Sequence, residues 1–160
     1  MKIKGKIEEL EDLYNKFKKE KLLTPINIYI EAAKKGDPMI FNINNVKLKG
    51  YVQSVDDYSL LLRALNSEKS VILYKGAFEH AKLDNDLPKG IGNQLLEIRP
   101  QQKLNDWMEN KNILQITTRT NSKYIGKIYN LTTYEIMIEN KDKEIEIISK
   151  HSIAYIIQGD

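Results

Sequence analysis

The chain has 160 residues, of which 41% are hydrophobic and 29% charged, and its formal net charge is +3. It contains no cysteine, which excludes disulfide bonds, thiolate metal sites and cysteine nucleophiles. No stretch approaches the roughly 20 apolar residues that span a bilayer, and the opening residues lack the apolar core of a signal peptide. We therefore expect a cytoplasmic protein without membrane association. Because the net charge is small, a polyanionic partner must be bound by local patches of charge.

Two helices are predicted at the start of the chain. Within residues 5–22, apolar side chains recur at spacings of three and four, which is typical of an amphipathic helix. Its basic end, 16–21, is either a phosphate-contacting arm or a solvated helix face, and charge runs favour the second interpretation. The next helix is predicted to begin after the N-cap Thr24 with Pro25, and to end before Gly36.

Strands follow the second helix with little interruption. Branched and aromatic residues between Asn, Asp and Ser turns predict strands at 40–43, 46–55, 58–65, 70–74 and around 77–83. Residues 84–99 are predicted to be a linker, because polar and turn-forming residues replace any hydrophobic period. A third helix is expected from Pro100, and strands return at 113–118, 123–130, 134–139, 144–148 and 153–157.

The two strand-rich parts share a pattern that recurs about 76 residues apart. Matching Asn, Lys, Gly and Tyr residues keep this offset, and a Lys near each end recurs one residue earlier; the pairs are Asn45 and Asn121, Lys47 and Lys123, Gly50 and Gly126, Tyr58 and Tyr134, Lys75 and Lys150. The paired glycines lie in mid-strand, where they permit the sharp bend of a small closed barrel. The sequence therefore predicts a mainly β protein with short N-terminal helices and two small five-stranded barrels in tandem. The expected divisions are an N-terminal helix (1–23), a first module (24–83), a linker (84–99) and a second module (100–160).

No catalytic set is recognisable in the sequence. His80 and His151 do not lie in a metal-ligand spacing, and no Walker loop or nucleophile motif is present. Asp56 and Asp57 are adjacent, so in a strand they would point to opposite faces, and they suit a turn better than an acid/base pair. We expect a protein that is not an enzyme and uses no cofactor or metal.

The combination of these elements resembles the bacterial Sm-like RNA chaperone Hfq. The resemblance rests on a helix before five bent strands, the Asn-to-Gly motif ending at Gly50 or Gly126, and a tyrosine before a hydrophobic strand. It covers residues 25–80 and 101–156. It implies SH3-type Sm-like barrels and self-association into a ring of six modules. Two modules in one chain depart from the usual plan, so the ring would be a homotrimer, or a homohexamer if only one module builds it.

The resemblance also implies where RNA binds. In the family, uridines insert between modules, where an aromatic ring stacks on the base and a Tyr-Lys-His strand supplies donors. Tyr58 and Tyr134 match the stacking position, and the donor strand is matched by Tyr74, Lys75, Lys150 and His151. Stacking is physically reasonable because every base has a π face. The alternatives are that the tyrosines pack between modules and that His151 is structural.

The sequence departs from the family pattern in each module. Gly76 replaces the histidine of the first module, and Ser149 replaces the tyrosine of the second. We therefore expect these pockets to be weaker or differently selective. On the opposite face, which binds adenine-rich RNA in the family, the first module offers Phe41 and Lys47, and a basic rim at the helix end would use Lys34 and Lys35.

The leading hypothesis is an RNA chaperone that acts in post-transcriptional regulation. It would bind uridine-rich and adenine-rich single-stranded RNA and promote pairing between small regulatory RNA and mRNA, using several weak pockets at once. The alternative is a non-enzymatic scaffold of tandem SH3-like barrels that binds proteins. Only the first hypothesis predicts an affinity that falls steeply with salt.

Overall fold

A computed structural model describes residues 8–12 and 24–159 of the chain. Residues 8–12 are helical, whereas most of the helix predicted at 5–22, including its basic end, lies outside the described residues. Within residues 8–12 and 24–159, every helix is too short or too polar to span a bilayer.

The described chain is mainly β, as predicted. Besides the helical residues 8–12, the described helices are α2 (Pro25–Lys35) and α3 (Pro100–Glu109), with short 3-10 helices η1 (Lys75–Ala77) and η2 (Lys150–Ser152). The strands are β1 (Met39–Ile43), β2 (Val46–Val55), β3 (Ser59–Ala64), β4 (Ser70–Tyr74), β5 (His80–Leu83), β6 (Ile113–Thr118), β7 (Lys123–Leu131), β8 (Glu135–Glu139), β9 (Ile145–Ser149) and β10 (Ile153–Gln158).

Local sequence signals fix the ends of α2. The Thr24 side chain accepts a hydrogen bond from the Asn27 backbone N–H at 3.2 Å, and Pro25 lies in the first turn. Gly36 ends the helix with a left-handed φ of 70°. The helix packs on the first five strands through its buried side chains Tyr29, Ala32 and Ala33.

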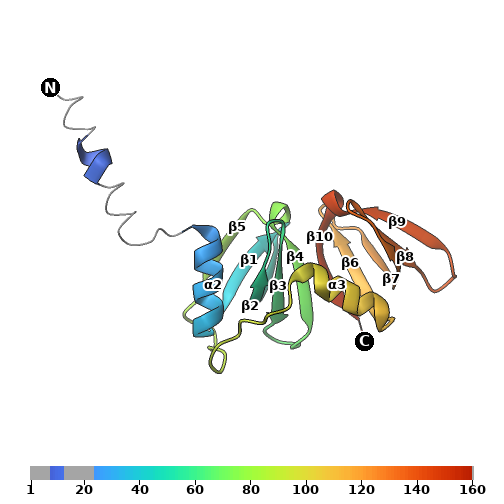
Figure 1. Cartoon of the computed structure of the whole chain (residues 1–160), viewed down its shortest axis with the longest axis horizontal. Coiled ribbons are helices and arrows are strands. Elements are labelled where there is room, and N and C mark those ends of the chain that lie inside the picture. The colour runs from blue at the N-terminus through green and yellow to red at the C-terminus, as the bar shows by residue number, and fades with distance from the viewer. Residues whose placement is uncertain (1–7, 13–23, 160) are drawn as a thin grey trace.

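All ten strands form one antiparallel sheet (Figure 1), in the order β5-β1-β2-β3-β4-β10-β6-β7-β8-β9. Each half has the same internal order, with its fifth strand beside its first. We call residues 25–83 the first repeat and residues 100–158 the second. They join through β4 and β10, where Ile72 lies opposite Ile156. The predicted arrangement of two small barrels in tandem is therefore not confirmed, since one continuous sheet runs through both repeats. The outer edges of the sheet are β5 and β9.

The paired glycines allow neighbouring strands to approach closely. A Cβ at Gly50 would lie 2.6 Å from the Arg63 carbonyl oxygen, and a Cβ at Gly126 would lie 2.5 Å from the Glu139 carbonyl oxygen. Both repeats also carry a register irregularity in the same place, just after the glycine. The recurring glycine thus serves one backbone arrangement, built twice.

Replacing Gly126 with alanine is expected to lower the free energy of unfolding by about 1–3 kcal/mol, because the new methyl group would press on the backbone of β8. Denaturant unfolding measures the change, and Ile125→Ala on the same strand, where the side chain is exposed, should have little effect. Equal midpoints for the two variants would contradict this explanation of the glycine.

Two hydrophobic cores meet at the junction of the repeats. The first includes α2 and strands β1–β4, and the second includes α3 and strands β6–β9. Leu61 and Ile72 belong to the first repeat but are buried in the second core with Leu104 and Trp107. Ala154 of β10 is buried in the first core. Strands β3 and β4 are therefore covered on both faces, and the repeats share one hydrophobic junction.

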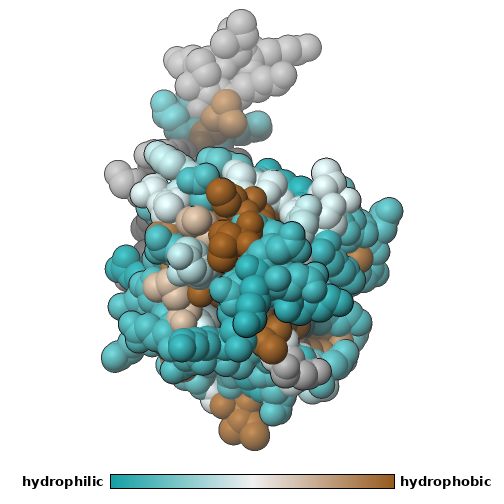
Figure 2. Space-filling view, turned by 90° about the vertical axis from the view of Figure 1, so that its right-hand side faces the viewer, coloured by the Kyte–Doolittle hydropathy of each residue, from teal (hydrophilic) through white to brown (hydrophobic). Residues whose placement is uncertain are grey.

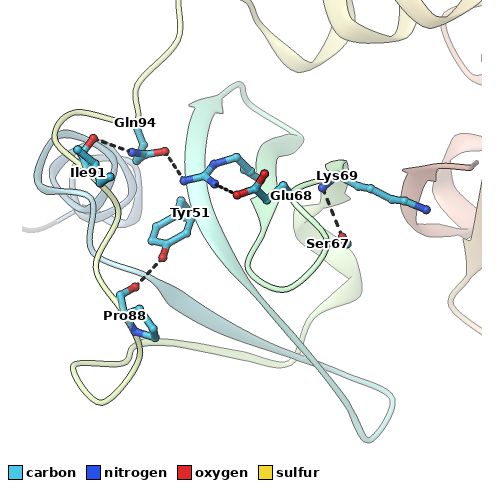
Figure 3. Close-up of polar contacts among 8 residues, drawn as sticks. Tyr51, Ser67, Glu68, Lys69, Pro88, Ile91 and Gln94 are labelled. Carbon is cyan, nitrogen blue, oxygen red and sulfur yellow. Dashed lines mark hydrogen bonds and ion pairs between the residues drawn. The ribbon is translucent and has the colours of Figure 1, made fainter.

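Residues 84–99 contain neither helix nor strand, and they lie against the first repeat. The Tyr51 hydroxyl donates to the Pro88 carbonyl at 2.6 Å, and Arg63 donates to the Gln94 side chain at 2.9 Å (Figure 3). The Leu96 N–H donates to a β2 carbonyl at 2.7 Å. This connection between α3 and β5 is thus docked on the outer side of β2 and β3.

Candidate nucleic-acid interface

A pocket of about 460 Å³ lies between the two repeats. Six of the residues predicted from sequence to contact RNA line it, three from each repeat: Tyr58, Tyr74, Lys75, Tyr134, Lys150 and His151. They come from the turns before β3 and β8, the end of β4, and the 3-10 helices η1 and η2. Positions that are far apart in the sequence therefore converge because β4 and β10 pair.

The same backbone bond places tyrosine and lysine together in both repeats. The Lys75 N–H donates to the Tyr58 carbonyl at 2.8 Å, and the Lys150 N–H donates to the Tyr134 carbonyl at 2.8 Å. The turn before Tyr58 is held by Asp56, whose carboxylate accepts from the backbone N–H groups of Tyr58 and Ser59. As predicted, Asp56 therefore serves turn geometry.

The two stacking candidates differ in what they touch. Tyr58 is 78% exposed, and none of the ring contacts among the described residues involves it. Tyr134 is 66% exposed, and the His151 ring stacks on it with centroids 6.3 Å apart. Neither tyrosine is held by packing between the repeats. Tyr58 offers a π face that no other described ring covers.

Two polar groups of the pocket, Lys150 and Tyr74, are partly desolvated. Burial lowers the pKa of Lys150, and the Asp56 carboxylate opposes that shift. Burial, reinforced by Asp56, raises the pKa of Tyr74, so its hydroxyl stays protonated at neutral pH and can donate a hydrogen bond. In residues 24–159, neither Lys75 nor Lys150 forms an ion pair. The lysines are therefore able to contact an anionic ligand.

The remaining predicted residues lie elsewhere. Phe41 is fully buried in the first core, with its ring against Tyr29 and Phe78, which corrects the prediction that it faces RNA. Lys47, on β2, and Lys34 and Lys35, in the last turn of α2, are exposed but do not line the pocket. The structure thus brings together the residues predicted to bind uridine. Of the remaining predicted residues, only the lysines Lys34, Lys35 and Lys47 are exposed.

Arg119 also lines the pocket and was not predicted from the sequence. It lies in the turn after β6, and its guanidinium approaches Gly76, where an added Cβ would be 2.7 Å from Nη2. The residue 76 positions earlier is Ile43, which is buried. Because the arginine is present in only one repeat, the recurring pattern gives no signal for it.

A second hollow, of about 590 Å³, opens on the outer side of the second repeat. Its lining includes Lys127 and Glu139, which occupy the positions of Tyr51 and Arg63 in the first repeat. There, residues 84–99 cover the corresponding surface. The exposed side chain of Ile125 also lines this hollow.

No family model and no curated protein matches the sequence. Among solved structures, the chain is similar to a crystal structure of the pleiotropic translational regulator Hfq, with 15% sequence identity and a TM-score of 0.36. The match covers 38% of this chain and 89% of that chain.

Proposed function

We propose that this protein is a non-catalytic RNA-binding protein whose two Sm-like modules, 24–83 and 100–160, hold uridine-rich single-stranded RNA in the pocket between them. The observation that supports the proposal most strongly is the convergence of six predicted side chains, three from each repeat, on that one pocket. The two repeats thus contribute equally to the lining of one pocket.

The chemistry of the pocket suits a single-stranded nucleic acid. The exposed ring of Tyr58 can stack on a base, which contributes about 1–3 kcal/mol. Lys75 and Lys150 can neutralise phosphates, and Tyr74 and His151 can donate hydrogen bonds to a base carbonyl. Binding two RNAs on one assembly would bring a small regulatory RNA and an mRNA together in the cytoplasm. Because Phe41 is buried, we limit the proposal to uridine-rich RNA.

The test is the salt dependence of binding to a fluorescent uridine-rich oligonucleotide. For single strands the logarithm of the binding constant falls by about 0.7 per contacted phosphate for each unit of log salt. Lys75→Ala and Lys150→Ala should each flatten the slope by about that amount, because each removes one phosphate contact. Lys141→Ala, which removes an exposed charge outside the pocket, should leave the slope unchanged. Equal slopes in all four proteins would contradict the proposed contacts.

We further propose that copies of the chain associate through the outer edges of the sheet. Inside the chain, a fourth strand (β4) pairs with a fifth strand (β10); the outer edges are again a fourth strand (β9) and a fifth strand (β5). Ile147 on β9 occupies the position of Ile72 on β4, yet Ile147 is 63% exposed while Ile72 is fully buried. Figure 2 views the molecule from the side on which β9 lies in Figure 1, and it shows apolar side chains at that surface. Unpaired strand edges of this kind favour association.

Replacing Ile147 with lysine is therefore expected to abolish self-association while preserving the fold. A charged side chain on an edge strand opposes pairing with another edge. Sedimentation should give three times the mass of the chain for the parent, as in a trimer of tandem modules, and a monomer for Ile147→Lys. Ile91→Lys, at a 97% exposed position in 84–99, should still assemble. A parent that stays monomeric at micromolar concentration would contradict the proposal, and a hexamer would mean that one module builds the ring.

A protein-binding scaffold is the second candidate function. It is favoured by the hollow on the second repeat, because on the first repeat the same surface holds a polypeptide segment, residues 84–99. A scaffold would show no salt-dependent RNA affinity, so the oligonucleotide titration separates the two functions.

A further inference from the structure

We propose that Arg119 binds phosphate in the pocket between the repeats, in addition to Lys75 and Lys150, and that Gly76 is required because it leaves room for the guanidinium. The ligand class is a nucleotide, held by its phosphate as well as by its base. This inference rests on the proposed RNA-binding function and names the group that the same pocket recognises.

The backbone holds Arg119 from both repeats. Its N–H donates to the Ser152 carbonyl at 2.8 Å, which ties it to the end of η2. Its carbonyl accepts a hydrogen bond from the side-chain amide of Asn44, in the turn between β1 and β2. These two hydrogen bonds fix the turn that carries Arg119 at the junction of the repeats. From there the Arg119 side chain extends to Gly76 of the first repeat.

The absence of a side chain at Gly76 leaves space for the Arg119 guanidinium. A Cβ at residue 76 would lie 2.7 Å from Nη2 of Arg119 and 3.3 Å from Cζ. The residue that follows lysine in the second repeat is His151, whereas here it is glycine. An arginine from the second repeat thus lies over the position where the first repeat has no side chain.

The charges around Arg119 favour an anion. In the described ranges, its guanidinium has no hydrogen-bond or ion-pair partner, and Lys75 and Lys150 line the same pocket without ion pairs. The Asp56 carboxylate accepts bonds from Ser59 and from the Tyr58 backbone, and the Asp57 side chain also lines the pocket. A guanidinium remains charged at all relevant pH values, and its planar fork fits two phosphate oxygens.

The arginine also makes this pocket different from any pocket formed between copies of the chain. In such a pocket, the position of Arg119 would be taken by Ile43 of the next copy, which is 2% exposed and carries no charge. An assembly would therefore contain two kinds of pocket, and only the kind within one chain would have a guanidinium for phosphate.

Comparing uridine monophosphate with uridine tests the inference, since only the first carries a phosphate. Each ligand is titrated into the full-length chain and binding is followed by NMR. Arg119→Ala should lower the affinity for uridine monophosphate by about tenfold, which is the effect of losing one charge-assisted hydrogen bond. The affinity for uridine should not change. Arg119→Lys should retain part of the affinity, because it keeps the charge but loses the fork. Gly76→Ala should lower the affinity for uridine monophosphate as much as Arg119→Ala does, because the new methyl group displaces the guanidinium. The melting temperature should not change, because the displaced group is the end of a flexible side chain.

Lys141→Ala serves as the control for the loss of one positive charge outside the pocket. The inference is overturned if Arg119→Ala lowers the affinities for uridine monophosphate and for uridine equally. It is also overturned if the parent binds uridine monophosphate and Arg119→Ala changes neither affinity. It is also overturned if the parent binds neither ligand. A parent that binds the nucleotide through Arg119 but does not bind uridine-rich oligonucleotides would sustain the phosphate site and reject the proposed RNA function.

Discussion

Replacing Ile72 with alanine is expected to lower the free energy of unfolding by about 2–5 kcal/mol. Ile72 lies on β4, is fully buried, and belongs to the second core although it comes from the first repeat. Its removal leaves a cavity at the shared junction, next to the strand pair β4–β10. Because the junction joins both cores, removing the Ile72 side chain should destabilise both repeats together, and the chain should still unfold in one cooperative transition. Denaturant unfolding at submicromolar concentration measures the change.

The sequence repeat supplies a matched control for this substitution. Ile147 is the equivalent residue of the second repeat and is 63% exposed, so Ile147→Ala should change the stability by less than about 0.5 kcal/mol at that dilution. If the two alanine variants lose similar free energy, or if Ile72→Ala unfolds in two steps, the repeats do not share a core.

Replacing Tyr58 with alanine is expected to weaken binding of uridine-rich single-stranded RNA by about 1–3 kcal/mol, or roughly 5- to 150-fold. The ring is exposed in the pocket between the repeats, and no contact among the described rings occupies its face. Tyr134→Ala should have a smaller effect, because His151 already stacks on that ring. Fluorescence anisotropy at fixed salt measures both changes.

Tyr129 provides the control for this experiment. It is 60% exposed on β7 but does not line the pocket, so Tyr129→Ala should bind like the parent. A Tyr58→Ala protein that folds and binds uridine-rich RNA with the affinity of the parent would mean that the base does not stack on Tyr58.

Local signals made much of the fold predictable. Thr24, Pro25 and Gly36 bound α2 because capping and the left-handed turn depend on residues close in sequence. The paired glycines were also found correctly, although their reason is a close carbonyl on the neighbouring strand. The joining of all strands into one sheet was not predicted, because the choice of β10 as the partner of β4 depends on residues about 85 positions apart.

The candidate site was predictable where the pattern repeats, and Tyr74 and His151 were predicted from the family resemblance. Tyr58 and Lys75 were found with their counterparts because both copies keep the pattern. Phe41 was assigned to the opposite face, but whether a strand residue faces solvent depends on the elements that cover it, here α2 and the ring of Phe78. Arg119 has no counterpart in the first repeat, so only the approach of the two repeats identifies it as part of the pocket.

The most direct test of the proposed function is the affinity of the unmodified protein for a uridine-rich single-stranded oligonucleotide at several salt concentrations. We predict binding that weakens steadily as salt rises, with a slope that corresponds to several phosphate contacts, and weaker binding to double-stranded RNA of the same length. Absence of binding at low salt, or an affinity that does not change with salt, would contradict the proposal that the pocket between the repeats binds RNA.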